Sequence, residues 1–231
     1  MTKAIRFHQT GGSDVLKYED ITLAPPGAGE VRLRHTAIGV NFIDTYHRSG
    51  LYPVPLPSGL GKEVAGVVEA VGEGVTGLKV GDRVASASAP LGMYAQGSNV
   101  PAKDLVKIPD GVSDEVAAAA MLKGLTAWYL LRETYKVQSG EIIVVHSAAG
   151  GVGLILCQWA KALGVTVVGT VGSEAKVAPA RAAGCAHVLV LGEGWEKKAR
   201  EIAPGGVPVV YDSVGKDTFE GSLNCLRPRG L

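Results

Sequence analysis

The chain has 231 residues, of which 46% are hydrophobic and 19% are charged, and its formal net charge is +1 at pH 7. This composition excludes a disordered chain and supplies enough apolar side chains for a globular protein, which we expect to have two domains. The small net charge, with no run of lysine and arginine, argues against a nucleic acid or an anionic membrane as partner, and so favours a small molecule. No apolar stretch approaches the roughly 20 residues of a membrane span, and residues 1–7 do not resemble a signal peptide.

The three cysteines, Cys157, Cys185 and Cys225, are far apart and odd in number. This usage suits a reducing compartment, so we expect a cytoplasmic protein with free and mostly buried thiols.

Short strands broken by glycine and proline dominate the first half. Val31, Leu33 and Ala37 alternate with polar residues at the two-residue period of a half-buried strand, and similar short apolar pieces occur at 67–68, 84–85 and 94–95. These patterns predict a compact, mostly antiparallel β domain. From Ser113, a plausible helix cap, an Ala/Leu-rich helical stretch continues to about Tyr135.

Strands and helices then alternate along the chain. Apolar, β-branched runs are found at 142–145, 165–168, 187–191 and 207–211, and helical segments are expected at 153–163, 174–183, 195–203 and 217–225. Four strand–helix units predict a doubly wound parallel sheet of the Rossmann type. The fold class is therefore α/β, with domains at 1–125 and 126–231.

A glycine-rich turn follows the first of these strands. In the segment from His146 to Gly153, a dinucleotide fingerprint is matched by Ala148, Gly150 and Gly153, with alanine in place of the first glycine. The helix that begins here would present free N–H groups to a pyrophosphate. The alternative is a strand–helix turn that binds nothing, and the position of the turn between a strand and a helix favours the fingerprint.

The second strand of this sheet ends without an acidic residue, in Thr170-Val171-Gly172-Ser173. An acidic residue there would bind the ribose of NAD, whereas Ser173 and Lys176 could bind a 2′-phosphate, which predicts NADPH. In the alternative, Glu174 binds the ribose of NADH and Lys176 is a solvated helix residue.

Several motifs together resemble the zinc-free quinone oxidoreductases, the zeta-crystallin-like branch of the medium-chain dehydrogenases/reductases. The resemblance covers the whole chain, and the motifs that carry it are the segments 41–46, 48–53, 122–126, 148–153 and 211–215. It implies a GroES-like catalytic domain, a Rossmann domain and a cleft for NADPH.

The resemblance also implies roles for individual residues. The nicotinamide end of the cofactor would be lined by Asn41, Phe42, Ile43, Asp44, Thr45 and Tyr46, with Lys123, Thr126 and Tyr129 nearby. The rest of the cofactor would be held by Gly150, Gly151, Val152 and Gly153 at the pyrophosphate, by Gly172, Ser173 and Lys176 at the adenosine phosphate, and by Val214 near the adenine. Tyr46 and Tyr52 would flank the substrate, and the catalytic set would be Asn41, Tyr46, Tyr52, Lys123 and Thr126. Leu191 stands where close bacterial relatives tend to place a tyrosine beside the 2′-phosphate.

The residues predict no metal site. Metal-dependent relatives carry a cysteine near position 41 and a Gly-His-Glu motif, whereas this chain has Asn41 and Gly61-Lys62-Glu63, with no cysteine before Cys157. The five histidines show no ligand spacing, so each is interpreted as a core or surface residue.

These features predict the transfer of reducing equivalents from NADPH to a quinone. A quinone is already electron-poor, so the protein needs to hold it against the nicotinamide and exclude water. Tyr46 and Tyr52 could stack on the ring and donate to a developing oxyanion, or they could simply pack. Lys123 could bring a charge to the cofactor or extend to solvent. The alternatives are an NADPH-dependent enone or alkenal reductase, and an NADPH-binding structural or RNA-binding protein.

The length of the chain leads to one more expectation. Doubly wound domains of this type usually carry six strands in the order 3-2-1-4-5-6, and only four are found here. The resemblance implies that roughly a further hundred residues complete the sheet, and that the complete enzyme is a homodimer. We also expect the fourth strand of the 231-residue chain to be an unpaired edge, and this chain to bind NADPH weakly and show little activity.

Overall fold

The computed structural model describes residues 1–231, which form two compact units, Met1–Leu122 and Lys123–Leu231. α2 (Asp114–Tyr129) begins in the first unit and ends in the second. No helix combines the length and the apolar character that a membrane span requires.

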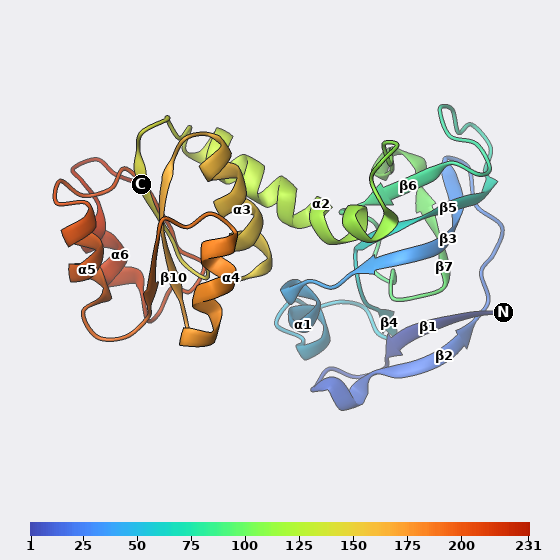
Figure 1. The fold of residues 1–231 in the computed structure, drawn as a ribbon. Coiled ribbons are helices and arrows are strands. Elements are labelled where there is room, and N and C mark those ends of the chain that lie inside the picture. The colour runs from blue at the N-terminus through green and yellow to red at the C-terminus, as the bar shows by residue number, and fades with distance from the viewer. The chain divides into compact units, whose positions relative to one another are not determined.

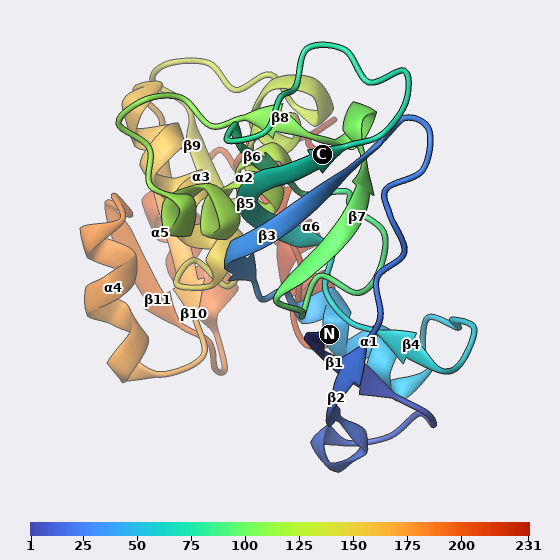
Figure 2. The same cartoon turned by 90° about the vertical axis from the view of Figure 1, so that its right-hand side faces the viewer.

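Two antiparallel sheets build the first unit (Figure 2). The smaller sheet has the order β2-β1-β4 and contains β1 (Thr2–Phe7), β2 (Lys17–Ile21) and β4 (Ser58–Gly59). The larger sheet has the order β7-β3-β5-β6-β8 and contains β3 (Glu30–Gly39), β5 (Glu63–Val71), β6 (Arg83–Ser86), β7 (Gly97–Pro101) and β8 (Val106–Lys107). Every pairing in both sheets is antiparallel, as the strand patterns predict.

β3 shows why the two-residue period is a good guide here. Val31 and Leu33 are fully buried against β5 and β7, while Arg34 is exposed. The register shifts between His35 and Ala37, and beyond this irregularity Ala37 is only partly buried. The expectation of a strand at 94–95 is wrong, because Ala95 forms only a single bridge with Ala4.

The sequence patterns above do not predict α1 (Phe42–Ser49). Its first turn is closed by a capping box in which the Asn41 backbone N–H donates to Asp44 Oδ2 at 2.9 Å and the Asn41 side chain meets the backbone of Asp44. Gly50, with φ of 84°, ends the helix in the left-handed conformation that favours glycine. The predicted cap at Ser113 is confirmed, since the Val116 N–H donates to Ser113 Oγ at 3.2 Å at the start of α2, and a π-helical turn (Leu130–Thr134) follows that helix.

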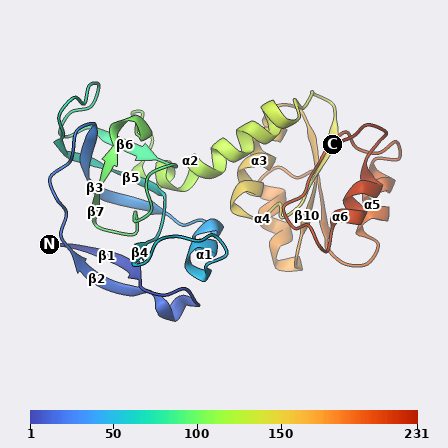
Figure 3. The ribbon, with the colours of Figure 1, turned by 180° about the vertical axis from the view of Figure 1, so that it is seen from behind.

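The second unit is a four-stranded parallel sheet in the order β11-β10-β9-β12. Its strands are β9 (Ile142–Val145), β10 (Thr166–Val171), β11 (His187–Val190) and β12 (Val210–Tyr211). α3 (Gly151–Ala162) and α4 (Val177–Ala182) cover one face, and α5 (Trp195–Ile202) and α6 (Phe219–Cys225) cover the other (Figures 1 and 3). The predicted order 3-2-1-4 of a doubly wound sheet is thus confirmed.

β12 is shorter than predicted, and its outer edge is not bare. The expectation that this strand leaves its backbone groups unpaired is wrong at two positions, because Leu231 donates to the Pro208 carbonyl and accepts from the Val210 N–H, both at 2.9 Å.

Candidate cofactor site

The glycine-rich turn joins β9 to α3. Ser147 has a φ of 51°, and the Gly150 N–H donates to the Ser147 carbonyl at 2.7 Å, so the chain reverses sharply before the helix. Gly150 is the N-cap and has no side chain to occupy the helix N-terminus. The N–H groups of the first helical turn have no intrahelical acceptor, so this end can receive an anion.

Alanine can occupy the first fingerprint position because β10 makes room for it. A Cβ added to Gly169 would lie 2.7 Å from Ala148 Cβ and 2.6 Å from Cys185 Sγ. Ala148 is fully buried in this space, and its N–H donates to the Thr170 carbonyl at 3.0 Å. The missing side chain of Gly169 therefore compensates for the departure from the glycine pattern.

Gly153, in the third position, packs directly against the turn. A Cβ there would overlap the Ser147 carbonyl oxygen and lie 2.8 Å from Ala148 Cα. At the helix start, a Cβ on Gly151 would lie 3.0 Å from Lys123 Cδ and 3.1 Å from Lys123 Cε, so the lysine stem crosses Gly151. The structure thus brings the cation of Lys123 beside the predicted pyrophosphate turn.

The carboxyl end of β10 is open. Gly172, Ser173 and Lys176 are exposed, and a Cβ added to Gly172 would meet nothing within 4 Å. Lys176 and Glu174 lie in the same 3-10 turn. The residue that favours NADPH and the residue that would favour NADH are therefore at the same end of β10. Leu191 is partly buried at the end of β11 and packs on the core.

A hollow of about 720 Å³ opens between the loops that follow β11 and β12. Glu193, Glu196, Asp217 and Glu220 line it, against one cation, Lys216. This acidic lining would repel a phosphate, so the glycine-rich turn and the β10 end fit the phosphates of a dinucleotide better.

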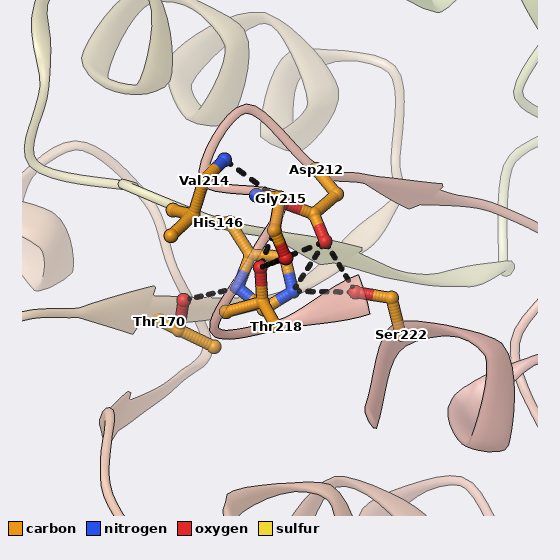
Figure 4. A network of polar contacts seen from close by, with 7 residues as sticks. All are labelled: His146, Thr170, Asp212, Val214, Gly215, Thr218 and Ser222. Carbon is orange, nitrogen blue, oxygen red and sulfur yellow. Dashed lines mark hydrogen bonds and ion pairs between the residues drawn. The ribbon is translucent and has the colours of Figure 1, made fainter. Parts of the chain in front are cut away.

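Three polar residues that the sequence interpretation left without a specific role lie at the carboxyl ends of β9 and β12 (Figure 4). His146 follows β9 and Asp212 follows β12, and Ser222 on α6 contacts both. The Asp212 carboxylate also accepts from the N–H groups of Val214 and Gly215 at 2.9 Å each, so it shapes the turn that holds Val214. The position of a polar residue directly after each strand is the signal that the sequence offered.

α1 gathers the predicted substrate residues of the first unit. The Tyr46 ring lies 5.3 Å from that of Tyr52 and 5.4 Å from that of Phe42. Tyr52 is 48% exposed, so it is not an ordinary core residue, and Phe42 is 75% exposed. This cluster offers flat faces and a phenol hydroxyl to an aromatic ligand.

Asn41 and Glu63 are buried together. Asn41 Nδ2 donates to Glu63 Oε2 at 2.7 Å, and the Leu122 N–H donates to Glu63 Oε1 at 2.8 Å, so both carboxylate oxygens have partners. Asp44 Oδ2 accepts from the Tyr94 hydroxyl at 2.7 Å as well as from Asn41. No group of three or more His, Cys, Asp or Glu residues is arranged to hold a metal ion.

The predicted site residues therefore fall into three groups. Asn41, Phe42, Ile43, Asp44, Thr45, Tyr46 and Tyr52 lie on or beside α1 in the first unit. Lys123, Thr126 and Tyr129 lie on the part of α2 that belongs to the second unit. Gly150, Gly151, Val152, Gly153, Gly172, Ser173, Lys176 and Val214 lie in loops and a helix start at the carboxyl edge of the parallel sheet.

Two protein-family models match this chain, one in each unit. The family model of the alcohol dehydrogenase GroES-like domain matches residues 27–110, and that of the zinc-binding dehydrogenases matches residues 151–231. The chain is 56% identical over 234 residues to a quinone oxidoreductase of Pseudomonas aeruginosa, covering all of this chain and 72% of that protein. The chain belongs to the quinone oxidoreductase family.

Two further relatives are named for what they bind or reduce. The structure of Escherichia coli quinone oxidoreductase complexed with NADPH is 50% identical, has a TM-score of 0.95, and is matched over 99% of this chain and 71% of that chain. A 2-haloacrylate reductase of a Burkholderia species is 49% identical, over all of this chain and 72% of its own length. The resemblance inferred from the sequence motifs is confirmed.

Proposed function

We propose that this chain transfers reducing equivalents from NADPH to a quinone. The observation that carries the proposal is the glycine-rich turn before α3, which offers a free helix N-terminus and the stem of Lys123, together with the open, acid-free end of β10. The quinone oxidoreductase relatives, one of them complexed with NADPH, give this dinucleotide site its ligand.

Each part of the cofactor has residues that suit it. The diphosphate suits the N–H groups of Gly151, Val152 and Gly153 and the charge of Lys123, because both carry positive charge toward an anion. The 2′-phosphate suits Ser173 and Lys176. We assign the nicotinamide end to Asn41, Phe42, Ile43, Asp44, Thr45 and Tyr46, with Thr126 and Tyr129, and the adenine edge to Val214.

NADPH, when bound, supplies a hydride equivalent. The protein's own part is to hold the acceptor and exclude water. Tyr46 and Tyr52 present their rings to the quinone, and a phenol hydroxyl donates to the ring oxygen on which negative charge develops. Asn41 and Glu63 bind each other and so keep the base of α1 fixed.

A steady-state screen tests this function. We expect NADPH oxidation to depend on an added quinone and to be unchanged by a chelator. An activated alkene such as a 2-haloacrylate is the second substrate class to include, because of the relative with that activity. Faster turnover of the alkene than of every quinone would assign the chain to the enone reductase class instead.

Tyr52 is the residue to change first. Tyr52→Ala removes one ring of the pair, and a stacking contribution of about 0.5–1.5 kcal/mol corresponds to a roughly 2- to 13-fold lower kcat/KM for the quinone. NADPH affinity should stay within about twofold of that of the unsubstituted chain. Tyr18→Ala is the matched control, since Tyr18 is another exposed tyrosine of the same unit and lies on β2, outside the proposed site. An unchanged quinone rate in Tyr52→Ala would leave Tyr52 with a packing role only.

The proposal extends to a homodimeric assembly and a cytoplasmic location. Three free, buried thiols fit a reducing compartment, and the homodimer rests on the family resemblance. Sedimentation equilibrium measures the mass directly, and a monomer at all concentrations would contradict the assembly.

A further inference from the structure

A chain of buried hydrogen bonds links the loops that follow β9 and β12 (Figure 4). His146 Nδ1 lies 2.7 Å from Thr170 Oγ1, and His146 Nε2 lies 3.0 Å from Ser222 Oγ. Ser222 Oγ in turn lies 2.7 Å from Asp212 Oδ2. The Trp195 ring packs edge-on against the imidazole, with ring centroids 4.8 Å apart.

The direction of each proton in this chain follows from Asp212. Its carboxylate accepts from two N–H groups, from Thr218 Oγ1 and from Ser222 Oγ, and these bonds lower its pKa although burial acts in the opposite direction. The carboxylate can therefore only accept, so the Ser222 hydroxyl proton points at Asp212. Ser222 Oγ must then accept from His146 Nε2–H.

The tautomer of His146 is fixed as a result. Burial lowers the pKa of His146, which keeps the imidazole neutral, with its proton on Nε2 and a lone pair on Nδ1. The lone pair accepts from the Thr170 hydroxyl. Thr170 thus holds the glycine-rich turn twice, through its hydroxyl on His146 and through its carbonyl on the Ala148 N–H at 3.0 Å.

This chain of bonds crosses the place where the strand order reverses. In the order β11-β10-β9-β12, the reversal lies between β9 and β12, and ligands of doubly wound sheets bind at that crevice, outside the carboxyl ends of the strands. His146 stands on one side of the crevice and Asp212 on the other, joined by Ser222.

We infer that His146, Ser222 and Asp212 are positioning residues for the dinucleotide, which set the spacing between the glycine-rich turn and the turn of Val214 and Gly215. This inference rests on the proposed function. His146 fixes the start of the first turn, and Asp212 fixes the second by accepting from both of its N–H groups. His146 Nε2 and Asp212 Oδ2 lie 3.9 Å apart, and the Ser222 hydroxyl bridges them with two shorter hydrogen bonds, so this hydroxyl transmits the spacing.

Ser222→Ala tests the link in the apo protein and in NADPH binding. Without the hydroxyl, the two turns lose their common partner, and we expect the dissociation constant for free NADPH to rise about tenfold, with kcat at saturating NADPH within twofold. In the apo protein, hydrogen exchange of the Val214 and Gly215 amides should accelerate. Thr170→Val keeps the shape of its side chain and removes the donor to Nδ1, so it should raise the dissociation constant in the same direction and serves if Ser222→Ala does not fold.

Ser98→Ala is the matched control. His35 Nε2 lies 2.8 Å from Ser98 Oγ in the first unit, so this pair repeats the chemistry of His146 and Ser222 outside the dinucleotide turns. We expect a similar loss of thermal stability in both alanine variants, but weaker NADPH binding only in Ser222→Ala.

The outcomes separate the inference from the proposed function. Unchanged NADPH affinity in Ser222→Ala and in Thr170→Val, with measurable NADPH binding by the unsubstituted chain, would overturn the inference alone. An equal loss of affinity in Ser98→Ala would also overturn it, because a general loss of stability would then explain the effect. Failure of the unsubstituted chain to bind NADPH would overturn the proposed function and this inference together.

Discussion

At the scale of single residues, the cofactor preference depends on what stands at the end of β10. Ser173 and Lys176 are exposed there, and a Cβ added to Gly172 would meet nothing within 4 Å, so a phosphate has room and two donors. Glu174 lies in the same 3-10 turn and would serve a ribose hydroxyl instead. The balance between them is decided by charge, because a 2′-phosphate attracts the lysine and repels the glutamate.

Lys176→Glu is the variant that reverses this balance. A hydrogen bond between charged groups contributes about 1.5–3 kcal/mol, which exposure of Lys176 reduces, so we expect NADPH affinity to fall about tenfold and NADH affinity to change little. The preference is measured as the ratio of the two dissociation constants. Lys197→Glu makes the same charge change at an exposed position on α5, outside the proposed site, and should leave the ratio unchanged. Equal use of both cofactors by the unsubstituted chain would remove the role of Lys176.

Some site residues can be found from the sequence and others need the fold. Gly150 and Gly153 stand in a fingerprint whose spacing is local, so the pattern alone indicates them. His146 and Ser222 are 76 residues apart and meet only because α6 packs beside the sheet, which no local pattern encodes. The Asn41–Glu63 bond is likewise a contact between a helix cap and a distant strand.

At the scale of elements, α3 packs closely against the glycine-rich turn at Gly153. Alanine normally stabilises a helix interior by about 1 kcal/mol relative to glycine, because it loses less backbone entropy. At Gly153 the added methyl would overlap the Ser147 carbonyl oxygen, so close packing outweighs that gain. The same glycine that weakens the helix therefore lets it approach the turn.

Gly153→Ala and Gly124→Ala should have opposite effects. Gly153→Ala should lower the free energy of unfolding by about 1–3 kcal/mol through overpacking, and weaken NADPH binding because Ser147 and Ala148 must move. Gly124 lies in α2 with nothing within 4 Å of an added Cβ, so Gly124→Ala should raise the free energy of unfolding by about 0.5–1 kcal/mol. Urea denaturation measures the free energy of unfolding of both variants. A Gly153→Ala protein more stable than the unsubstituted chain would show that the turn accommodates the methyl group without strain.

The elements themselves follow closely from periodicity where they are long. β9, β10 and β11 overlap the predicted apolar runs. For β9 and β10 the reason is that strands buried on both faces read as β-branched segments, whereas β11 is an edge strand and is only partly buried. Periodicity does not predict α1, because this helix is only eight residues long and its ends are fixed by a capping box and by Gly50. β12 is shorter than its apolar run because Val207 pairs with Leu226 instead, outside the strand.

At the scale of the whole molecule, each unit contains one histidine whose pKa is lowered by burial, the partly buried His35 in the first and the buried His146 in the second. Burial outweighs the carbonyls of Ala95 and Met93 at His35, and it outweighs the charge of Asp212 at His146. Acid should therefore destabilise both units by the same physical cause.

The sign of the effect follows from proton binding. The ordinary pKa of histidine is 6.5, and each of these two binds fewer protons in the folded state than in the unfolded state at pH values between its lowered pKa and 6.5. The stabilisation is fully present above pH 6.5 and is lost as the pH falls through this window, by up to about 1.4 kcal/mol per pH unit for each histidine. Asp114 and Asp212, whose pKa values are lowered from 3.8, act only at more acidic pH.

Urea denaturation at pH 7.5 and 5.5 can assign the loss to each unit separately. Trp128, Trp159 and Trp195 are the three tryptophans of the chain and all lie in the second unit, so their fluorescence reports the unit of His146, while far-UV circular dichroism reports both. We expect His146→Gln to flatten the pH dependence of the fluorescence transition, and His35→Gln to change only the circular dichroism transition. His187→Gln, at an exposed position on β11, should change neither pH dependence. Equal stability of the unsubstituted chain at both pH values would contradict this prediction. At pH 5.5 the unfolded chain can protonate both histidines, so holding them neutral in the folded state must lower the free energy of unfolding.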